Sequence, residues 1–156
     1  IRNLSQKYQA GKINDQDLCK AINQHREKYY KSVDKKLIME SYYQWYGILS
    51  AVPKLFEKYK VLGVVRDPRD WVSSWVNYEA HFGRKDMVTR MGYRRLDPKM
   101  VGDAVYAKIW KGMSQFQKLC WTWSRVYDRI FDFTNKDSNS LMSFLESKPA
   151  CDFSLI

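Results

Sequence analysis

The spacing of apolar residues predicts a helix near the start of the chain. Asn14 and Asp15 are residue types that cap helices, and the apolar positions that follow recur every three or four residues. The residues on this face are Leu18, Ile22, His25, Tyr29 and Val33. We expect the face to pack into the core, with His25 as a packed structural histidine.

Two longer helical segments follow further along the chain. The first begins at Ser41, is interrupted near Pro53 and resumes through Leu55 and Phe56. The second runs from about Asp103 to Tyr127 and carries a regular apolar stripe. The stripe consists of Val105, Ile109, Met113, Phe116, Cys120, Trp123 and Tyr127. We interpret it as core.

Short apolar runs between the helices predict strands. The clearest is Val61–Val65, which is flanked by charged residues and is typical of a parallel strand covered on both faces. Leu37–Met39 and Arg129–Phe133 are predicted as two further strands, and Leu141–Leu145 as a final short helix. The order of elements predicts an α/β fold, a parallel sheet flanked by helices. Three strands are few, so we expect residues 1–156 to be one domain that belongs to a longer catalytic domain.

The segment after the clearest strand carries the candidate chemistry. Arg66 follows the last apolar residue of the strand, at the sheet edge where ligands of open α/β sheets bind. Asp67 and Pro68 begin a helix there. Its polar stripe consists of Asp70, Ser74, Asn77 and His81, and its aromatic stripe of Trp71, Trp75, Tyr78 and Phe82.

These residues admit two interpretations. In the first, Arg66 offers a planar, permanently charged fork to phosphate oxygens, the helix N-terminus attracts the same anion, and Ser74 donates a further hydrogen bond. In the second, Asp67 and Asp70 simply cap the helix while Arg66 pairs with a nearby carboxylate. The physical argument alone leaves both open.

This segment resembles a known motif. It combines the strand, the sequence Arg-Asp-Pro-Arg-Asp over residues 66–70, and a helix with Ser74 eight positions after Arg66. The known motif is the 3′-phosphate-binding motif of sulfotransferases that use 3′-phosphoadenosine-5′-phosphosulfate (PAPS). The resemblance implies a three-layer sandwich similar to that of P-loop nucleotide-binding proteins, and transfer of a sulfuryl group from PAPS to a hydroxyl or amine acceptor. It also implies that Arg66 and Ser74 bind the donor's 3′-phosphate, with Asp70 beside them.

Other elements of that family have no match in the chain. The glycines never form the loop that cradles the 5′-phosphosulfate. The Arg-Lys-Gly element and the Lys-x-His signature of the cytosolic branch are also missing from the sequence. Two explanations stay open: a piece of a longer enzyme, which we favour, and a relative without activity.

The remaining candidate residues are a carboxylate and a basic stretch. Glu40, after the predicted strand Leu37–Met39, is the candidate catalytic base, and its alternative is a surface or salt-bridged carboxylate. The basic residues after the motif helix are Arg84, Lys85, Arg90, Arg94, Arg95 and Lys99. We assign Arg94 and Arg95 to the donor site. Two alternatives stay open: the stretch recruits an anionic acceptor, or it is a solvated basic loop.

Charge and composition narrow the classes of partner. The formal net charge of +10 favours polyanions, and 15% of the residues are aromatic. A nucleic-acid-binding module is the rival class, but the aromatic residues fall mostly on helix stripes rather than between basic ones. Cys19, Cys120 and Cys151 lack metal-site spacing, so no metal is expected. Their odd, sparse count favours reduced thiols, with a single disulfide as the alternative. The sequence contains no run of about 18 apolar residues, so it predicts no membrane span. We expect a cytoplasmic protein, or a Golgi-lumenal one if a membrane anchor lies upstream.

Overall fold

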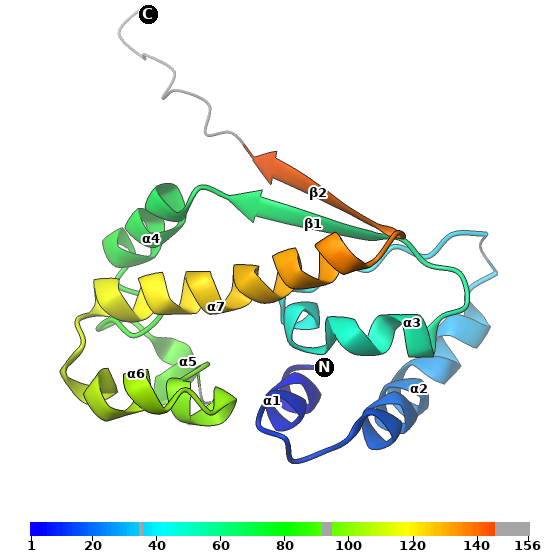
Figure 1. Ribbon diagram of the computed structural model, residues 1–156, viewed down its shortest axis with the longest axis horizontal. Helices are drawn as coiled ribbons and strands as arrows, with labels where there is room; N and C mark the ends of the chain where they lie inside the picture. The colour runs from blue at the N-terminus through cyan, green and yellow to red at the C-terminus, as the bar shows by residue number, and fades with distance from the viewer. Residues whose placement is uncertain (35, 92–94, 146–156) are drawn as a thin grey trace, which may run out of the picture.

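The computed structural model of the chain describes residues 1–34, 36–91 and 95–145. Most of these residues are helical, and a two-stranded parallel sheet lies along the long helix α7 (Figure 1). In chain order the described elements are α1 (Arg2–Gln9), α2 (Asp15–Ser32), the 3₁₀ helix η1 (Tyr43–Ala51), α3 (Val52–Leu55), β1 (Val61–Arg66), α4 (Pro68–Asn77), α5 (Met87–Arg90), the 3₁₀ helix η2 (Pro98–Val101), α6 (Ala104–Ile109), the 3₁₀ helix η3 (Trp110–Gly112), α7 (Gln115–Lys136) and β2 (Ser140–Leu145). The chain is therefore α/β, as predicted.

The sheet consists of β1 and β2, which run in parallel. Val61 lies opposite Ser140, and Val65 lies opposite Phe144. The predicted strand over Val61–Val65 is confirmed. The predicted helix over Leu141–Leu145 is wrong, because this segment pairs with β1 along its whole length. A short apolar run fits either element, and here the long-range pairing decides.

Helix α7 covers one face of β1. Gly63 and Val65 are buried on that face, and a Cβ added to Gly63 would lie 2.9 Å from Ile130 Cγ2 on α7. The missing side chain lets the helix approach the strand closely. Leu62 and Val64 are 64% and 43% exposed, so the prediction that both faces are covered is wrong for the described part of the chain.

The predicted strand over Arg129–Phe133 is wrong, because these residues form the last turns of α7. Leu119, Thr122 and Val126 are buried on one side of the helix, and Ile130 continues that side at the same spacing. The helical stripe extends through the short apolar run, so the run cannot act as a separate strand.

The predicted helix from Asp103 to Tyr127 is broken into α6, η3 and α7. Met113 has an extended backbone (φ −71°, ψ 138°), and Ser114 caps α7 in a capping box with Gln117. The break separates the predicted apolar stripe into two parts that no longer share a face. Three of its members are exposed rather than buried: Val105 (71%), Ile109 (54%) and Phe116 (58%).

The predicted strand over Leu37–Met39 is also wrong. The segment is irregular, and Leu37 and Met39 are 83% and 88% exposed. No described strand pairs with it. The run is too short to hold an extended conformation without such a partner.

The core of the first third of the chain confirms two predicted helical segments. Asn14 caps α2 by accepting a hydrogen bond from the Asp17 amide at 2.9 Å. The buried cluster consists of Leu18, Ile22, Ile48 and Ala51, so α2 packs against η1. The segment after Ser41 forms η1 and α3, with Pro53 in the first turn of α3. The predicted interruption near Pro53 is wrong, because η1 continues directly into α3 and the kink lies at Ile48. His25 is exposed, so its prediction as a packed residue is wrong. Among the α2 side chains that the structure describes, the buried ones, Leu18 and Ile22, lie in the first half of the helix.

A second cluster lies around α7 and joins it to η1. Its buried members are Tyr46, Leu96, Trp121 and Val126. In the described ranges, no helix has the length and apolar character that a membrane span requires.

Candidate functional site

The junction between β1 and α4 is built as the sequence predicts. Arg66 ends β1, the Asp67 side chain accepts a hydrogen bond from the Arg69 amide at 2.8 Å, and Pro68 occupies the first turn of α4. The Trp123 indole Nε1 on α7 donates to the Arg66 carbonyl oxygen at 3.2 Å. The helix start and the backbone of Arg66 are therefore both fixed.

The ion pair at this junction does not involve Arg66. The Arg69 guanidinium contacts Asp67 at 2.7 Å, and this hydrogen bond, together with the Arg69 amide, lowers the pKa of Asp67 to about 2. Arg66 is exposed, and no carboxylate of the described chain pairs with it. The alternative interpretation is thus half right: Asp67 caps the helix, but the arginine that it binds is Arg69.

The polar stripe of α4 is shorter than predicted. Asp70 and Ser74 are half-buried and lie one turn apart on the helix. The helix ends at Asn77, so His81 does not continue the stripe. On the neighbouring face, Trp71 and Trp75 are in edge contact, with ring centroids 6.1 Å apart.

Glu40 does not follow a strand, because the predicted strand before it does not form. Its carboxylate forms an ion pair with Arg26 on α2, at 2.7 Å. The salt-bridged alternative therefore describes its position, and its role as a catalytic base stays a prediction. Arg94 lies outside the described residues.

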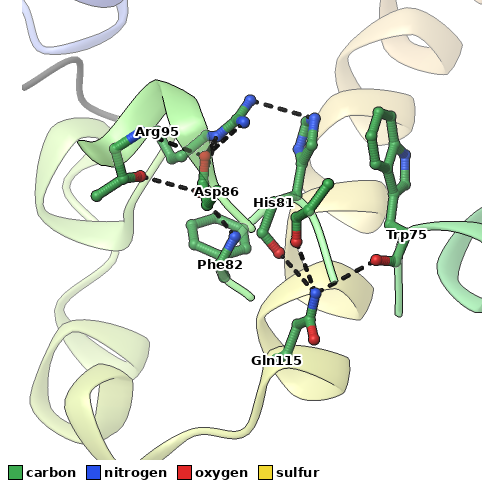
Figure 2. A network of polar contacts seen from close by, with 8 residues as sticks. Trp75, His81, Phe82, Asp86, Arg95 and Gln115 are labelled. Carbon is green, nitrogen blue, oxygen red and sulfur yellow. Dashed lines mark hydrogen bonds and ion pairs between the residues drawn. The ribbon is translucent and has the colours of Figure 1, made fainter. Parts of the chain in front are cut away.

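Arg95 belongs to a buried network that the sequence did not reveal (Figure 2). Its Nη2 atom contacts Asp86 Oδ1 at 2.8 Å, and Asp86 is only 4% exposed. The carboxylate also accepts from the Phe82 amide at 2.8 Å and from Thr89 Oγ1 at 2.9 Å. Burial alone would raise the pKa of Asp86, but Arg95 and the other donors outweigh burial and hold it well below its usual range.

His81 is the second partner of Arg95. The distance from Arg95 Nη1 to His81 Nε2 is 3.1 Å, and because arginine only donates, Nε2 must accept. The imidazole is therefore neutral, with its proton on Nδ1. Burial and the nearby charge of Arg95 lower the pKa of His81 to about 4. The ring also lies against Trp75, with centroids 3.9 Å apart.

The loop that carries His81 has an unusual backbone. Glu79, His81 and Phe82 have φ values of 50°, 28° and 65°, in the region that non-glycine residues rarely adopt. Gln115 Nε2 lies 2.6 Å from the Ala80 carbonyl oxygen and 3.1 Å from that of His81 (Figure 2). The first residue of α7 thus holds the loop in this conformation.

A small pocket lies beside the network. Its volume is about 30 Å³, and its lining includes Arg2, Tyr43, Gln44, His81 and Arg95. Since a water molecule needs roughly 10–15 Å³ by this measure, the pocket has room for two or three waters and is too small for a nucleotide.

The structure thus separates the predicted residues into three places. Arg66, Asp70 and Ser74 lie on β1 and α4, Arg95 lies in the buried network, and Glu40 lies against Arg26. Sequence reasoning missed Asp86, although it is the only acidic residue between Glu79 and Asp97 and stands in a basic stretch. A single carboxylate in a stretch of basic residues indicates that it forms an ion pair with one of them. Gln115 and Arg2 gave no such signal.

The described ranges contain no group of three or more metal-ligating side chains, and Cys19 and Cys120 are free thiols. Cys151 lies outside them. No protein-family model matches the chain, and no curated protein or solved structure matches it significantly.

Proposed function

We propose that the protein is a PAPS-dependent sulfotransferase and that the β1–α4 junction binds the donor's 3′-phosphate. One observation supports this most. Arg66 stands exposed at the carboxyl end of a parallel strand, no described carboxylate neutralises it, and α4 begins two residues later. Parallel sheets bind their ligands at this edge, and the surrounding sequence has the spacing of the family motif.

Each residue of the junction has a separate role in the proposal. Arg66 supplies charge and two parallel donors to the phosphate oxygens. Ser74, two turns into α4, donates one hydrogen bond. Asp70 can only accept when ionised, so it suits a hydroxyl of the ribose rather than the phosphate itself. Because Asp67 already occupies the Arg69 amide, the helix contributes mainly through its dipole.

The finer features of the family are part of the same proposal. The sheet would belong to a three-layer sandwich, and PAPS would supply the sulfuryl group for a hydroxyl or amine acceptor. The residues of this chain would bind and orient the donor through its 3′-phosphate, since positioning is a large part of such catalysis. Arg95 is already bound to Asp86, so Arg66 and Ser74 carry the assignment.

Titration with the desulfated donor, 3′-phosphoadenosine-5′-phosphate, tests the proposal. We expect binding that is much tighter than that of adenosine-5′-phosphate. Arg66→Ala should weaken it by roughly 2–4 kcal/mol, about 30- to 1000-fold, because a charge-assisted partner is lost. Arg90→Ala is the control, since Arg90 is exposed and has no side-chain partner in the described chain. Equal affinity for the two nucleotides, or an unchanged affinity in Arg66→Ala, would contradict the assignment.

A further inference from the structure

The pocket beside the buried network has an unusual balance of charge. Arg2 and Arg95 both line it, and none of the residues that line it is acidic. Asp86 neutralises Arg95, but no carboxylate in the described ranges pairs with Arg2, which is half-buried. The pocket therefore carries one positive charge that the described chain does not balance.

The wall of the pocket also holds hydrogen-bond donors that the network leaves unused. Arg95 has five N–H groups, and its bonds to Asp86 and His81 use one each on Nε, Nη1 and Nη2 (Figure 2). Two N–H groups remain. The Nδ1–H of His81 has no acceptor within the described chain either.

These donors are held rigidly. Asp86 is buried and fixes the Arg95 fork through two nitrogens, while Trp75 and Gln115 fix His81 from the other side. A site that is ordered before its ligand arrives avoids the entropy of ordering on binding. Volume gives the last constraint, because a pocket with room for two or three waters admits no ligand larger than a small ion.

We propose that the pocket between Arg2, His81 and Arg95 binds a small tetrahedral oxyanion, phosphate or sulfate, at a site separate from the β1–α4 junction. Net positive charge, unused donors and the small volume all favour this class of ligand. The larger nucleotide does not fit, so the pocket is not a second donor site. The inference does not depend on the sulfotransferase assignment.

A phosphate titration of the Arg66→Ala variant tests the pocket without interference from the junction. We expect saturable binding by calorimetry, with sodium chloride at equal ionic strength as the reference. Gln44→Glu places a carboxylate on the pocket wall and should abolish the binding. Arg2→Gln should weaken it at least tenfold, whereas Lys7→Gln, an exposed charge on the same helix, should not change it.

The alternatives give different results. Phosphate and sulfate also stabilise proteins generally by exclusion from the surface, and that effect neither saturates nor distinguishes the variants. A response of this kind, or equal losses in Arg2→Gln and Lys7→Gln, would overturn the proposal. If phosphate binds the Arg66→Ala variant while the nucleotide fails to bind wild type, the pocket stands and the sulfotransferase assignment fails.

Discussion

The β1–α4 junction and the loop from Glu79 to Arg95 use charge in opposite ways. At the junction, Arg66 is exposed and unpaired within the described chain, and its surroundings come from residues close in sequence. In the loop, Asp86 is buried and pairs with the largely buried Arg95, and Gln115 on α7 donates to the Ala80 carbonyl oxygen of the same loop. The first arrangement leaves a cation for a ligand, whereas the second uses its ion pair to hold the backbone. A count of basic residues cannot distinguish the two.

Removing the buried carboxylate of Asp86 should destabilise the protein more than the other changes to the loop region. Asp86→Ala leaves Arg95 uncompensated beside His81, so we expect a loss of about 3–5 kcal/mol in the free energy of unfolding. The denaturant midpoint measures it. Asp67→Ala removes an ion pair of similar length at the exposed junction and should shift the midpoint far less. Similar losses in the two variants would mean that the two regions do not differ as described.

Acid should weaken the same region through His81. Its pKa is about 4 in the folded protein, against an ordinary value of 6.5, so the unfolded chain binds the proton more readily. Stability should therefore be complete above pH 6.5 and fall towards pH 4, by up to about 3 kcal/mol. Unfolding curves at several pH values measure this slope.

A variant of His81 distinguishes its titration from that of the other groups. His81→Phe should flatten the slope between pH 6.5 and 4 without changing the loss at lower pH. That lower loss belongs to carboxylates such as Asp86 and Asp67, whose depressed pKa values give stability that is present above about pH 4 and disappears below it. An unchanged slope in His81→Phe would assign the upper transition to another group.

Removing the hydrogen bonds from Gln115 to the loop should lower the free energy of unfolding by a smaller amount. Gln115→Leu leaves the carbonyls of Ala80 and His81 without their donor, and we expect a loss of about 1–3 kcal/mol. Gln117→Leu is the matched control on the same turn, because within the described residues the hydrogen bonds of the Gln117 side chain are those of the capping box. Hydrogen exchange of residues 79–83 should accelerate in the first variant and not in the second.

The smallest effect should occur at the junction and concern binding alone. Ser74→Ala should lower the affinity for 3′-phosphoadenosine-5′-phosphate by about 1 kcal/mol, the value of one neutral donor. Its unfolding midpoint should stay within the error of wild type. A large loss of stability in this variant would show that the half-buried hydroxyl is structural.

Sequence reasoning succeeded where neighbouring residues decide the structure. The caps at Asn14 and Asp67 and the strand at Val61–Val65 are such cases. It failed where distant residues decide: β2 became a strand because β1 lies beside it, and the last turns of α7 stay helical because their stripe packs on the core. The placement of Glu40 failed with the strand that was to carry it. Arg66 and Ser74 could be located from local pattern alone, whereas Asp86 and Gln115 needed contacts between separate segments.

Gly63 ties the position of Arg66 to the packing of the core. Two of the contacts between helix α7 and β1 are far apart along the strand: Ile130 lies over Gly63, and Trp123, two turns earlier, donates to the Arg66 carbonyl oxygen. Because the helix is rigid, a displacement at the first contact is transmitted to the second. A methyl group at position 63 would push Ile130 away from β1 and, through the helix, shift Trp123 and the Arg66 backbone. A substitution at Gly63 would therefore change the position of Arg66 without contacting it.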